Sequence, residues 1–463
     1  MITENRKQKT ANRLFRVITF GCKVNQVDTA GLSQALAQQG WLTAPPGATP
    51  DLHLVNTCSV TARADQQARQ AIRRLSREFP GVPIWVTGCY AQRAPEELAA
   101  LPGVTLVLGN QEKIHIAELV NSEPIDPAMS SLSPSPLRGE GWGRGGVRCV
   151  VGGYAATTPF HPWLLRAFPG HTRAWLKIQE GCSHHCSYCI VPRVRGPRRS
   201  WAPAEVVAAL QGLAAAPHQE VVLTGVDLGQ YGQDLSPATS LAGLVRRLKQ
   251  AELPFRVRLS SLEPQEVTGE LLAELASWRA FCPHFHLPLQ SGAAKVLAAM
   301  NRPYRPGDFQ DLVADLARRF PDAALGLDVL VGFPGETAAD FAATQTLLAA
   351  LPLTYLHVFP FSPRPGTPAA ALQPLPGREV QRRAGLLRDL GRLKKQAFLH
   401  SQLGRVREVL VEGPAQQKGW LQGLSDNYLR AILRGPATWR HRRLLVRFTK
   451  LREETLVGEA VAG

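Results

Sequence analysis

Short apolar runs alternate with helical stretches over most of this chain, and this alternation restricts the fold more than any other feature. One alternating set occupies residues 13–120, and a second occupies residues 171–395. Strands that alternate with helices form parallel sheets with helices on their faces. We therefore expect an α/β protein, with a doubly wound parallel domain in the first range and a partial or complete (β/α) barrel in the second.

Three cysteines stand just past the predicted strands of the first range. Each one follows an apolar run: Cys22 after 16–20, Cys58 after 51–56 and Cys89 after 83–87. The carboxyl ends of parallel strands meet at one edge of a sheet, so these thiols can converge on a three-thiolate metal site. The alternative is three small buried side chains. Three amides that flank the cysteines can bind a ligand or cap helices and turns: Asn25, Asn56 and Gln92.

A denser group of thiols follows the apolar run 174–178. The spacing C-x3-C-x2-C places Cys182, Cys186 and Cys189 close enough to ligate one metal centre. A four-iron cube held by three cysteines keeps one iron open for another ligand. A zinc site or a chance spacing is the alternative. The triplet follows the first strand of the second range, at the barrel end that carries function in such folds.

The net charge of +16 predicts a polyanionic partner. Residues 378–463 contain 18 Lys and Arg against 8 Asp and Glu, so 18 − 8 = +10 of that charge lies in the tail. No apolar run approaches the roughly 18 residues that span a membrane, and the first residues do not resemble a signal peptide. We therefore expect a cytoplasmic protein without a membrane partner, whose thiols stay reduced and available to metals.

The remaining ranges differ in composition from the two α/β ranges. Residues 396–460 show short alternating strands, which predict a small all-β barrel, and Trp420, Tyr428 and Trp439 among basic residues suit RNA contacts. Residues 121–170 are rich in Ser and Pro and then in Gly and Arg, which predicts a linker without a core. That linker is either a passive insertion or an additional RNA contact, and Cys149 at its end has no assigned role.

The motifs around the triplet resemble the methylthiotransferase branch of the radical S-adenosylmethionine superfamily. The matching segments are Cys189–Ser200, Leu223–Gly225, Tyr231–Asp234, His286–Gly292, Asp328–Thr337 and Phe361–Thr367. The resemblance covers nearly the whole chain outside the linker and the first dozen residues. It also identifies the C-terminal barrel as similar to a TRAM domain, an OB-like RNA-binding module.

This resemblance implies two [4Fe-4S] clusters and S-adenosylmethionine as cofactors. Cys182, Cys186 and Cys189 would hold the cluster that binds S-adenosylmethionine and cleaves it to a 5′-deoxyadenosyl radical. Three further cysteines would hold an auxiliary cluster that delivers sulfur: Cys22, Cys58 and Cys89.

The resemblance also implies binding residues. Tyr188 would lie near the adenine of S-adenosylmethionine, Thr224 and Gly225 near its amine, and Ser260 and Glu263 near its ribose. Each assignment has a structural alternative. Tyr188 could be a packing residue, Gly225 could form a turn, and Glu263 could be a solvated acid in a loop. Four arginines beside the triplet suit phosphate or carboxylate contacts, or form a solvated basic loop: Arg193, Arg195, Arg198 and Arg199.

The pentapeptide Gly21–Asn25 indicates the substrate. It resembles the subgroup that converts N6-threonylcarbamoyladenosine at position 37 of tRNA, 3′ of the anticodon, to its 2-methylthio derivative. The isopentenyladenosine subgroup has Gln-Met in place of Lys23-Val24, and the subgroup acting on a ribosomal protein aspartate has Pro-Lys before the asparagine. We expect a monomer that uses tRNA and an electron donor of the flavodoxin or ferredoxin type. A non-catalytic metal-binding RNA protein is the alternative from another class.

Overall fold

The computed structural model describes residues 13–122, 140–142, 147–155, 157–168 and 171–461. The chain divides into two compact units. The first contains the described residues up to Leu165, with segments 181–183 and 189–197. The second contains 166–180, 184–188 and the chain from Arg198 onward. No helix in the described part of the chain is long and apolar enough to cross a membrane.

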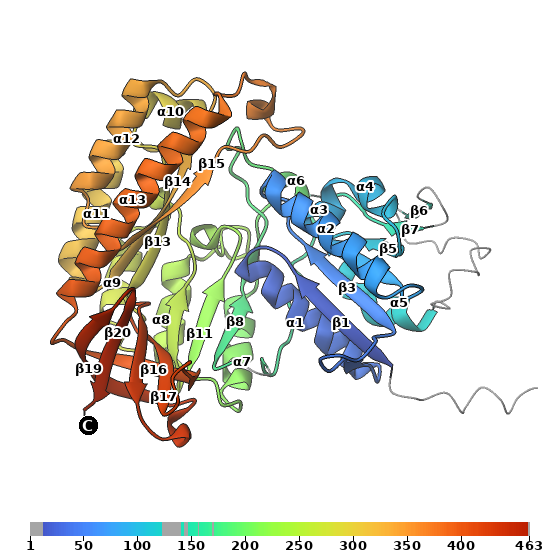
Figure 1. The fold of residues 1–463 in the computed structure, drawn as a ribbon, viewed down its shortest axis with the longest axis horizontal. Coiled ribbons are helices and arrows are strands. Elements are labelled where there is room, and N and C mark those ends of the chain that lie inside the picture. The colour runs from blue at the N-terminus through green and yellow to red at the C-terminus, as the bar shows by residue number, and fades with distance from the viewer. Residues whose placement is uncertain (1–12, 123–139, 143–146, 156, 169–170, 462–463) are drawn as a thin grey trace, which may run out of the picture. The chain divides into compact units, whose positions relative to one another are not determined.

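A seven-stranded sheet forms the centre of the first unit (Figure 1). Its order is β2 (Leu42–Thr43), β1 (Leu14–Thr19), β3 (Leu52–Thr57), β4 (Ile84–Gly88), β5 (Val104–Leu108), β7 (Arg148–Val150) and β6 (Glu140–Trp142). All neighbouring strands are parallel except β6 and β7. The predicted parallel α/β domain is therefore confirmed.

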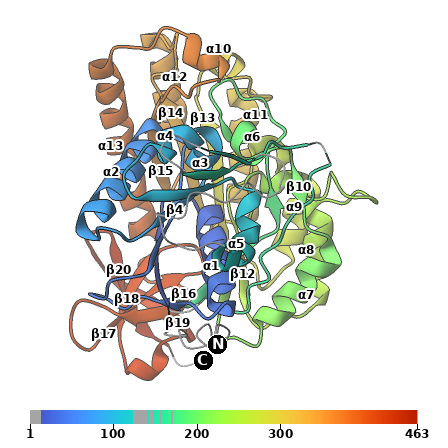
Figure 2. The ribbon, with the colours of Figure 1, turned by 90° about the vertical axis from the view of Figure 1, so that its right-hand side faces the viewer.

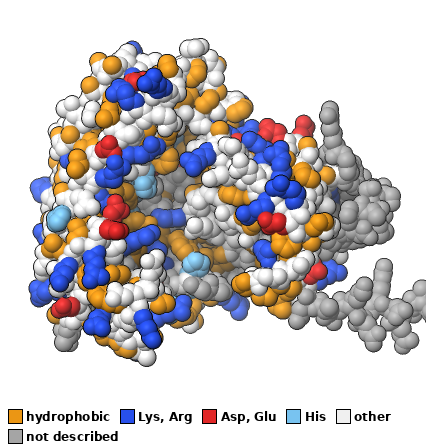
Figure 3. All heavy atoms as spheres, viewed as in Figure 1, with side chains coloured by type: hydrophobic (Ala, Val, Ile, Leu, Met, Phe, Trp, Pro, Cys, Tyr) orange, Lys and Arg blue, Asp and Glu red, His pale blue; other side chains and the backbone are white. Residues whose placement is uncertain are grey.

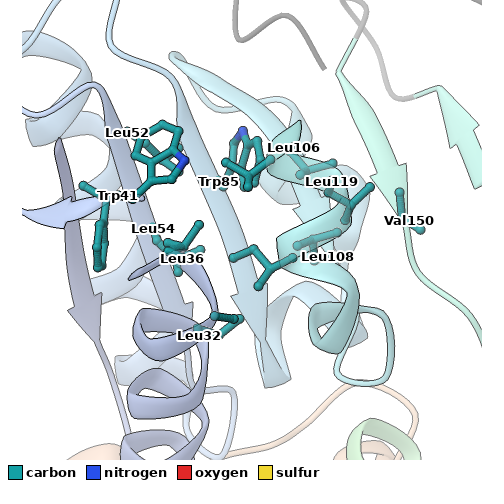
Figure 4. Close-up of a cluster of buried hydrophobic side chains, with 14 residues drawn as sticks. Leu32, Leu36, Trp41, Leu52, Leu54, Trp85, Leu106, Leu108, Leu119 and Val150 are labelled. Atoms are coloured by element: carbon teal, nitrogen blue, oxygen red, sulfur yellow. The ribbon is translucent and has the colours of Figure 1, made fainter. Parts of the chain in front are cut away.

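Helices cover both faces of this sheet. They are α1 (Lys23–Gln38), α2 (Ala62–Glu78), α3 (Cys89–Arg93), α4 (Pro95–Ala99) and α5 (Ile116–Ser122). Figure 4 shows one of the two cores, in which Leu36 of α1 and Leu119 of α5 pack near Trp85 of β4. Ile72 and Leu75 of α2 belong to the other core. The two separate cores show that the sheet is doubly wound.

The structure departs from the expected linker at β6 and β7, which lie within residues 121–170 and extend the sheet beyond β5. An uncovered edge strand exposes unpaired backbone groups, and pairing with β7 satisfies those of β5. Composition alone did not reveal this pairing because the stretch contains few apolar residues. The Ser- and Pro-rich part of the linker, 131–136, lies outside the described residues.

Six parallel strands form the partial barrel of the second unit. One sheet has the order β12 (Arg256–Leu259), β11 (Glu220–Thr224) and β8 (Arg173–Lys177). The other has the order β13 (His284–Gln290), β14 (Ala324–Val331) and β15 (Tyr355–Pro360). The two sheets adjoin where the Leu262 amide donates to the His286 carbonyl at 3.0 Å. The predicted partial (β/α) barrel is thus confirmed.

The helices of the second unit follow the strands in alternation. They are α7 (Pro203–Leu213), α8 (Leu241–Gln250), α9 (Gly269–Ala276), α10 (Ala294–Ala299), α11 (Pro306–Arg319), α12 (Ala338–Ala350) and α13 (Gly377–Ser401). Helices α7 and α8 pack side by side (Figure 2). Helix α13 packs along β15 and leads into the C-terminal barrel.

The C-terminal part is a closed five-stranded barrel, as the alternating strands predicted. Its order is β16 (Val406–Pro414), β17 (Trp420–Ser425), β18 (Arg430–Arg434), β20 (Thr455–Ala460) and β19 (Arg443–Arg452). Val409, Leu433 and Phe448 are fully buried in its core. Figure 3 shows Lys and Arg side chains spread over its outer surface, at the lower left.

Buried charges attach the C-terminal barrel to the central strands. Glu220 of β11 accepts hydrogen bonds from Arg256 and Arg258 of β12. The same guanidiniums donate to the carbonyls of Leu424 at 2.8 Å and Ser425 at 3.2 Å. Tyr428 stacks on His284 of β13, with ring centroids 4.3 Å apart. Tyr428 therefore packs toward the central strands and is only partly exposed, which leaves it a smaller surface for the RNA contact expected from the sequence.

Candidate metal centres and cofactor site

The three cysteines of the first unit lie together at the carboxyl ends of β1, β3 and β4. Cys22 precedes α1, Cys58 follows β3 and Cys89 begins α3. A Cβ on Gly21 would lie 2.7 Å from the Cβ of Cys58, so the loop that carries Cys22 touches Cys58. Burial raises the pKa of the Cys58 thiol to about 12, and the thiols of Cys89 and Cys22 contribute to this rise. All three thiols are free of disulfides. They fit a three-thiolate metal centre.

A buried cationic network supports this set of thiols. Arg195 Nε donates to Cys89 Sγ at 3.3 Å, and its Nη1 donates to Asp28 Oδ2 at 2.9 Å. Lys113 Nζ donates to the same Asp28 oxygen at 2.5 Å and to Asn110 Oδ1 at 2.9 Å. Two cations against one carboxylate leave a net positive charge beside the sulfurs. Such charge favours thiolates, the form in which cysteine binds metals.

The amides that flank the cysteines hold loops in place. Asn25 Nδ2 donates to the carbonyls of Phe20 and Thr57, and its Oδ1 accepts from Arg195. Asn56 Nδ2 donates to the Asn25 carbonyl at 2.9 Å. Gln92 Oε1 accepts from the Asn110 amide at 2.8 Å. These contacts fix the backbone around the thiols and involve no sulfur.

Sequence reasoning missed Asp28, Asn110 and Lys113. Asn110 comes two residues after β5, so the rule that gathers the cysteines at the strand ends also applies to it. Asp28 comes three residues after Asn25 on α1 and therefore shares its helix face. No pattern in the sequence pointed to Lys113.

The triplet lies in one loop between β9 (Gln179–Glu180) and α6 (Val191–Arg195). Gly181 begins this loop with φ +74, and a Cβ there would lie 1.9 Å from the Pro197 carbonyl oxygen, so only glycine fits. The Cys182 amide donates to the Gly196 carbonyl at 3.1 Å. The backbone thus places the first cysteine of the triplet without using its side chain.

Within the second unit, Arg302 lies beside Cys186. Its Nη1 donates to Cys186 Sγ at 3.4 Å, and it also forms an ion pair with Glu263. Burial raises the pKa of the Cys186 thiol, whereas Arg302 lowers it. The Ser187 amide donates to the Met300 carbonyl at 3.0 Å, which anchors this part of the loop. As at Cys89, a cysteine sulfur here lies beside an arginine that favours the thiolate. Cys186 therefore fits a ligand of an iron–sulfur cluster.

The five residues expected near S-adenosylmethionine all belong to the second unit. Tyr188 packs against an apolar cluster that includes Met300 and Phe333. Thr224 ends β11, and Gly225 allows Gln179 to approach, since a Cβ there would lie 2.8 Å from Gln179 Oε1.

The other two residues follow β12. Ser260 is buried, and its hydroxyl oxygen has no hydrogen-bond partner among the described residues. A buried polar atom of this kind normally has a partner, so a bound ligand would satisfy it. Glu263 pairs with Arg302, and burial raises the pKa of its carboxyl while Arg302 opposes this shift.

The four arginines near the triplet differ in exposure. Arg193 is exposed, and Arg198 is half-buried with its Nη1 donating to Gln230 and Gln233. Arg195 is buried in the network around Cys89, and Arg199 is buried near Glu180. The sequence shows four similar side chains, but only Arg193 and Arg198 reach the surface.

His184, inside the triplet loop, forms a polar cluster that sequence reasoning missed. Its Nε2 lies 2.9 Å from Glu266 Oε1 and 3.4 Å from Asp227 Oδ2. Burial raises the pKa of Asp227 to about 8, and the neighbouring Glu266 adds to this shift. The hydrogen bond that His184 donates to Glu266 raises the pKa of His184. These three residues come from distant loops, and no motif linked them.

Two family models match the chain. The model described as Uncharacterized protein family UPF0004 matches residues 14–109, and that of the Radical SAM superfamily matches residues 176–348. The two matches correspond to the sheet with the three strand-end cysteines and to the partial barrel with the triplet.

Curated relatives resemble the chain over most of its length. The threonylcarbamoyladenosine tRNA methylthiotransferase of Bacillus subtilis is 34% identical, over 90% of this chain and 89% of the relative. A ribosomal protein methylthiotransferase of Roseiflexus is 35% identical, over 87% and 86%. The tRNA-2-methylthio-N(6)-dimethylallyladenosine synthase of Corynebacterium jeikeium is 31% identical, over 90% and 79%.

A solved structure supports the fold. The radical S-adenosylmethionine methyltransferase TsrM from Kitasatospora setae matches with a TM-score of 0.54 and 18% identity, over 78% of this chain and 75% of that chain. Taken with the two cysteine sets and the relatives, these matches show that the chain belongs to the radical S-adenosylmethionine methylthiotransferase family.

Proposed function

We propose that this enzyme converts N6-threonylcarbamoyladenosine at position 37 of tRNA to its 2-methylthio derivative. One observation carries this proposal: a second set of three thiols, built at the strand ends of the first unit, accompanies the radical-generating triplet. A radical generator alone needs a single set. The second set suits a centre that supplies sulfur.

We assign the two sets to two [4Fe-4S] clusters, with S-adenosylmethionine bound at the triplet. Cys22, Cys58 and Cys89 would hold one cluster, and Cys182, Cys186 and Cys189 the other. When bound, these groups supply the radical, the sulfur and the methyl group. Inserting sulfur at the C2 position of adenine needs a radical because no polar route offers a good leaving group there.

The chain's own residues orient these groups. Arg195 and Arg302 each donate a hydrogen bond to a cysteine sulfur and offset the negative charge of the thiolates. For S-adenosylmethionine we assign Tyr188, Thr224, Gly225, Ser260 and Glu263, and the unpartnered hydroxyl of Ser260 supports its part in this set. The ion pair with Arg302 holds Glu263 in place.

The tRNA contact is assigned to exposed cations. Beside the triplet, Arg193 and Arg198 reach the surface and would contact the tRNA. Arg195 and Arg199 are buried and would not. On the C-terminal barrel the exposed basic side chains include Arg430 and Arg434 of β18 and Arg447 and Lys450 of β19. Contacts of this kind bind phosphates independently of sequence. We place the reaction in the cytoplasm, with a monomeric enzyme and an electron donor of the flavodoxin or ferredoxin type.

The threonylcarbamoyl substrate is preferred because of Lys23 and Val24, the two residues after Cys22. Overall identity does not separate the substrates, since the relatives named for a tRNA nucleoside and for a ribosomal protein are 34% and 35% identical. Isopentenyladenosine in tRNA and a ribosomal protein aspartate are the competing substrates within the family.

Mass spectrometry of tRNA nucleosides from a deletion strain tests the substrate. We expect methylthio-threonylcarbamoyladenosine to disappear and its precursor to accumulate. Wild type and Cys149→Ser should restore the product, whereas Cys58→Ser should not. Cys149 is the matched control because it lies outside both cysteine sets. If the product persists in the deletion strain, or if methylthio-isopentenyladenosine disappears instead, the substrate assignment is wrong.

Anaerobic reconstitution tests the reaction class. Two four-iron clusters require about eight iron and eight sulfide per chain. Zinc in place of iron, together with no release of 5′-deoxyadenosine under reduction, would favour a non-catalytic metal-binding RNA protein.

A further inference from the structure

Three metal-ligating side chains lie together on the second sheet of the partial barrel, and none of them is a cysteine of either set. His286 of β13, Asp328 of β14 and His357 of β15 each offer one donor atom, and these atoms lie within 4.8 Å of one another. His286 Nε2 is 2.8 Å from Asp328 Oδ1, and His357 Nδ1 is 3.3 Å from the same oxygen. The three strands are parallel neighbours, so regular structure holds the set in place.

The set lies on the face of the sheet that α13 does not cover. Leu356 of β15 lies against Gly391 of α13. The preceding side chain, Tyr355, points to the other face and lies against Gly326 of β14. Since side chains alternate along a strand, His357 shares the face of Tyr355. The exposed fractions of His286, Asp328 and His357 are 10%, 23% and 55%. An ion can therefore enter from the His357 side.

The spacing and the ligand types suit a metal ion. Nitrogen and oxygen ligands at about 2.1 Å from a metal place neighbouring donors about 3.0 to 3.4 Å apart, close to the two separations observed here. Asp328 contributes a carboxylate oxygen and the two histidines contribute ring nitrogens, ligand types that divalent metal ions accept.

The Tyr355 hydroxyl orients His286 through the other ring nitrogen of that histidine. The Tyr355 hydroxyl lies 3.1 Å from His286 Nδ1 and 2.7 Å from His284 Nε2. If Nδ1–H of His286 donates to this oxygen and the hydroxyl donates to His284, the lone pair of His286 Nε2 stays available. Ligating histidines in metal sites almost always have such a partner on their other nitrogen.

We propose that His286, Asp328 and His357 bind one divalent first-row transition-metal ion, such as Zn²⁺, Fe²⁺ or Mn²⁺. Two imidazoles and one carboxylate occupy one side of such an ion and leave the other positions open to water or an oxygen ligand.

The open positions fit the hydroxyl and carboxylate of a threonyl group, and this part rests on the proposed function. Without an ion, Asp328 repels a carboxylate. With a divalent ion bound, the local charge becomes about +1, and the same position attracts it. An isopentenyl group has no oxygen to offer. The ion therefore favours the threonylcarbamoyl substrate over the isopentenyl one.

Titration of the full-length, cluster-loaded protein with Mn²⁺ tests the ion site, because EPR spectroscopy measures the free ion and Mn²⁺ prefers oxygen and nitrogen to thiolate ligands. We expect one Mn²⁺ bound per chain, with His357→Ala and Asp328→Asn lowering the affinity at least tenfold. His115→Ala is the matched control, because it removes an exposed histidine 3.3 Å from the carboxylate of Glu118. Circular dichroism checks that each variant folds.

Two results would overturn the ion site: no binding by the wild type, or equal binding by wild type and His357→Ala. Adding threonylcarbamoyladenosine should change the EPR spectrum of the bound Mn²⁺, whereas isopentenyladenosine should not. An unchanged spectrum with both nucleosides rejects the substrate part alone. The proposed function is judged separately, by the tRNA nucleosides.

Discussion

Arg195 differs from Arg193, Arg198 and Arg199 because its charge is buried against a cysteine. A hydrogen bond from a charged donor is worth about 1.5 to 3 kcal/mol, which for one electron corresponds to roughly 60 to 130 mV. Replacing Arg195 removes both the bond and a positive charge beside Cys89. We therefore predict that Arg195→Gln makes the reduction potential of the auxiliary cluster more negative by about 60 mV or more.

The measurement is an EPR-monitored redox titration in a background with Cys182, Cys186 and Cys189 replaced by alanine. Arg193→Gln is the matched control, since Arg193 lies on the same short helix and is exposed. Equal potentials for the two variants would show that Arg195 does not act on the cluster.

His53 gives a pH dependence to the stability of the first unit. Burial, with a smaller effect from Arg16, lowers its pKa from 6.5 to about 4. Folding therefore favours the neutral ring, and the stability from this preference is present above pH 6.5 and is lost as the pH falls toward 4. Between pH 7 and pH 5 the wild type should lose about 2 kcal/mol that His53→Leu does not lose. Urea unfolding of the metal-free protein at both pH values measures this difference, with His115→Leu as an exposed control. Identical pH dependence for wild type and His53→Leu would contradict it.

Among the elements, the turn between β1 and α1 is the most constrained by its backbone. Gly21 has φ +100, and a Cβ there would lie 2.7 Å from the Cβ of Cys58. Gly40, after α1, has φ +82 with no atom within 4 Å of such a Cβ. Both alanine variants carry the strain of positive φ, about 1 kcal/mol, but only Gly21→Ala also displaces Cys58. We predict a loss of about 3 kcal/mol for Gly21→Ala and about 1 kcal/mol for Gly40→Ala.

Iron content after reconstitution distinguishes the two glycine variants further. Gly21→Ala should retain about half of the iron because the auxiliary site is disturbed, whereas Gly40→Ala should retain all of it. Full iron content in Gly21→Ala would mean that the loop can move away from Cys58 without affecting the metal centre.

The strands were predictable from the sequence because each one is a short apolar run between helical stretches. The apolar run at 51–56 matches β3, and the run at 83–87 matches β4. The six cysteines were predictable from spacing and from their place at strand ends. The buried role of Arg195 was not, because the sequence shows four arginines together and only packing separates them. The inward position of Tyr428 also depends on a partner, His284, that is distant in the sequence.

At the scale of the whole molecule, the basic C-terminal tail has two functions. Its exposed cations are available to an anionic partner, and its barrel is also joined to the central strands through buried charges. Glu220 balances Arg256 and Arg258, whose pKa values are raised by the attraction although burial opposes this shift. The barrel should therefore unfold together with the central domain. Glu220 is the fully buried carboxylate at this junction, beside the more exposed pairs of Arg173 with Glu412 and Arg256 with Glu408.

Removing that carboxylate tests the junction. Glu220→Gln leaves Arg258 without its counter-charge and Arg256 with only the half-buried Glu408, and breaking a buried ion pair in this way costs about 3 to 5 kcal/mol. Because the same guanidiniums hold the Leu424 and Ser425 carbonyls, the barrel should loosen, and limited proteolysis should cut between α13 and β16. Glu270→Gln is the matched control, because it breaks an exposed pair with Arg246 that contributes little to stability in water. If both variants resist protease as the wild type does, the charges around Glu220 do not hold the barrel in place, and other contacts, such as Tyr428 with His284 and Arg173 with Glu412, carry the attachment.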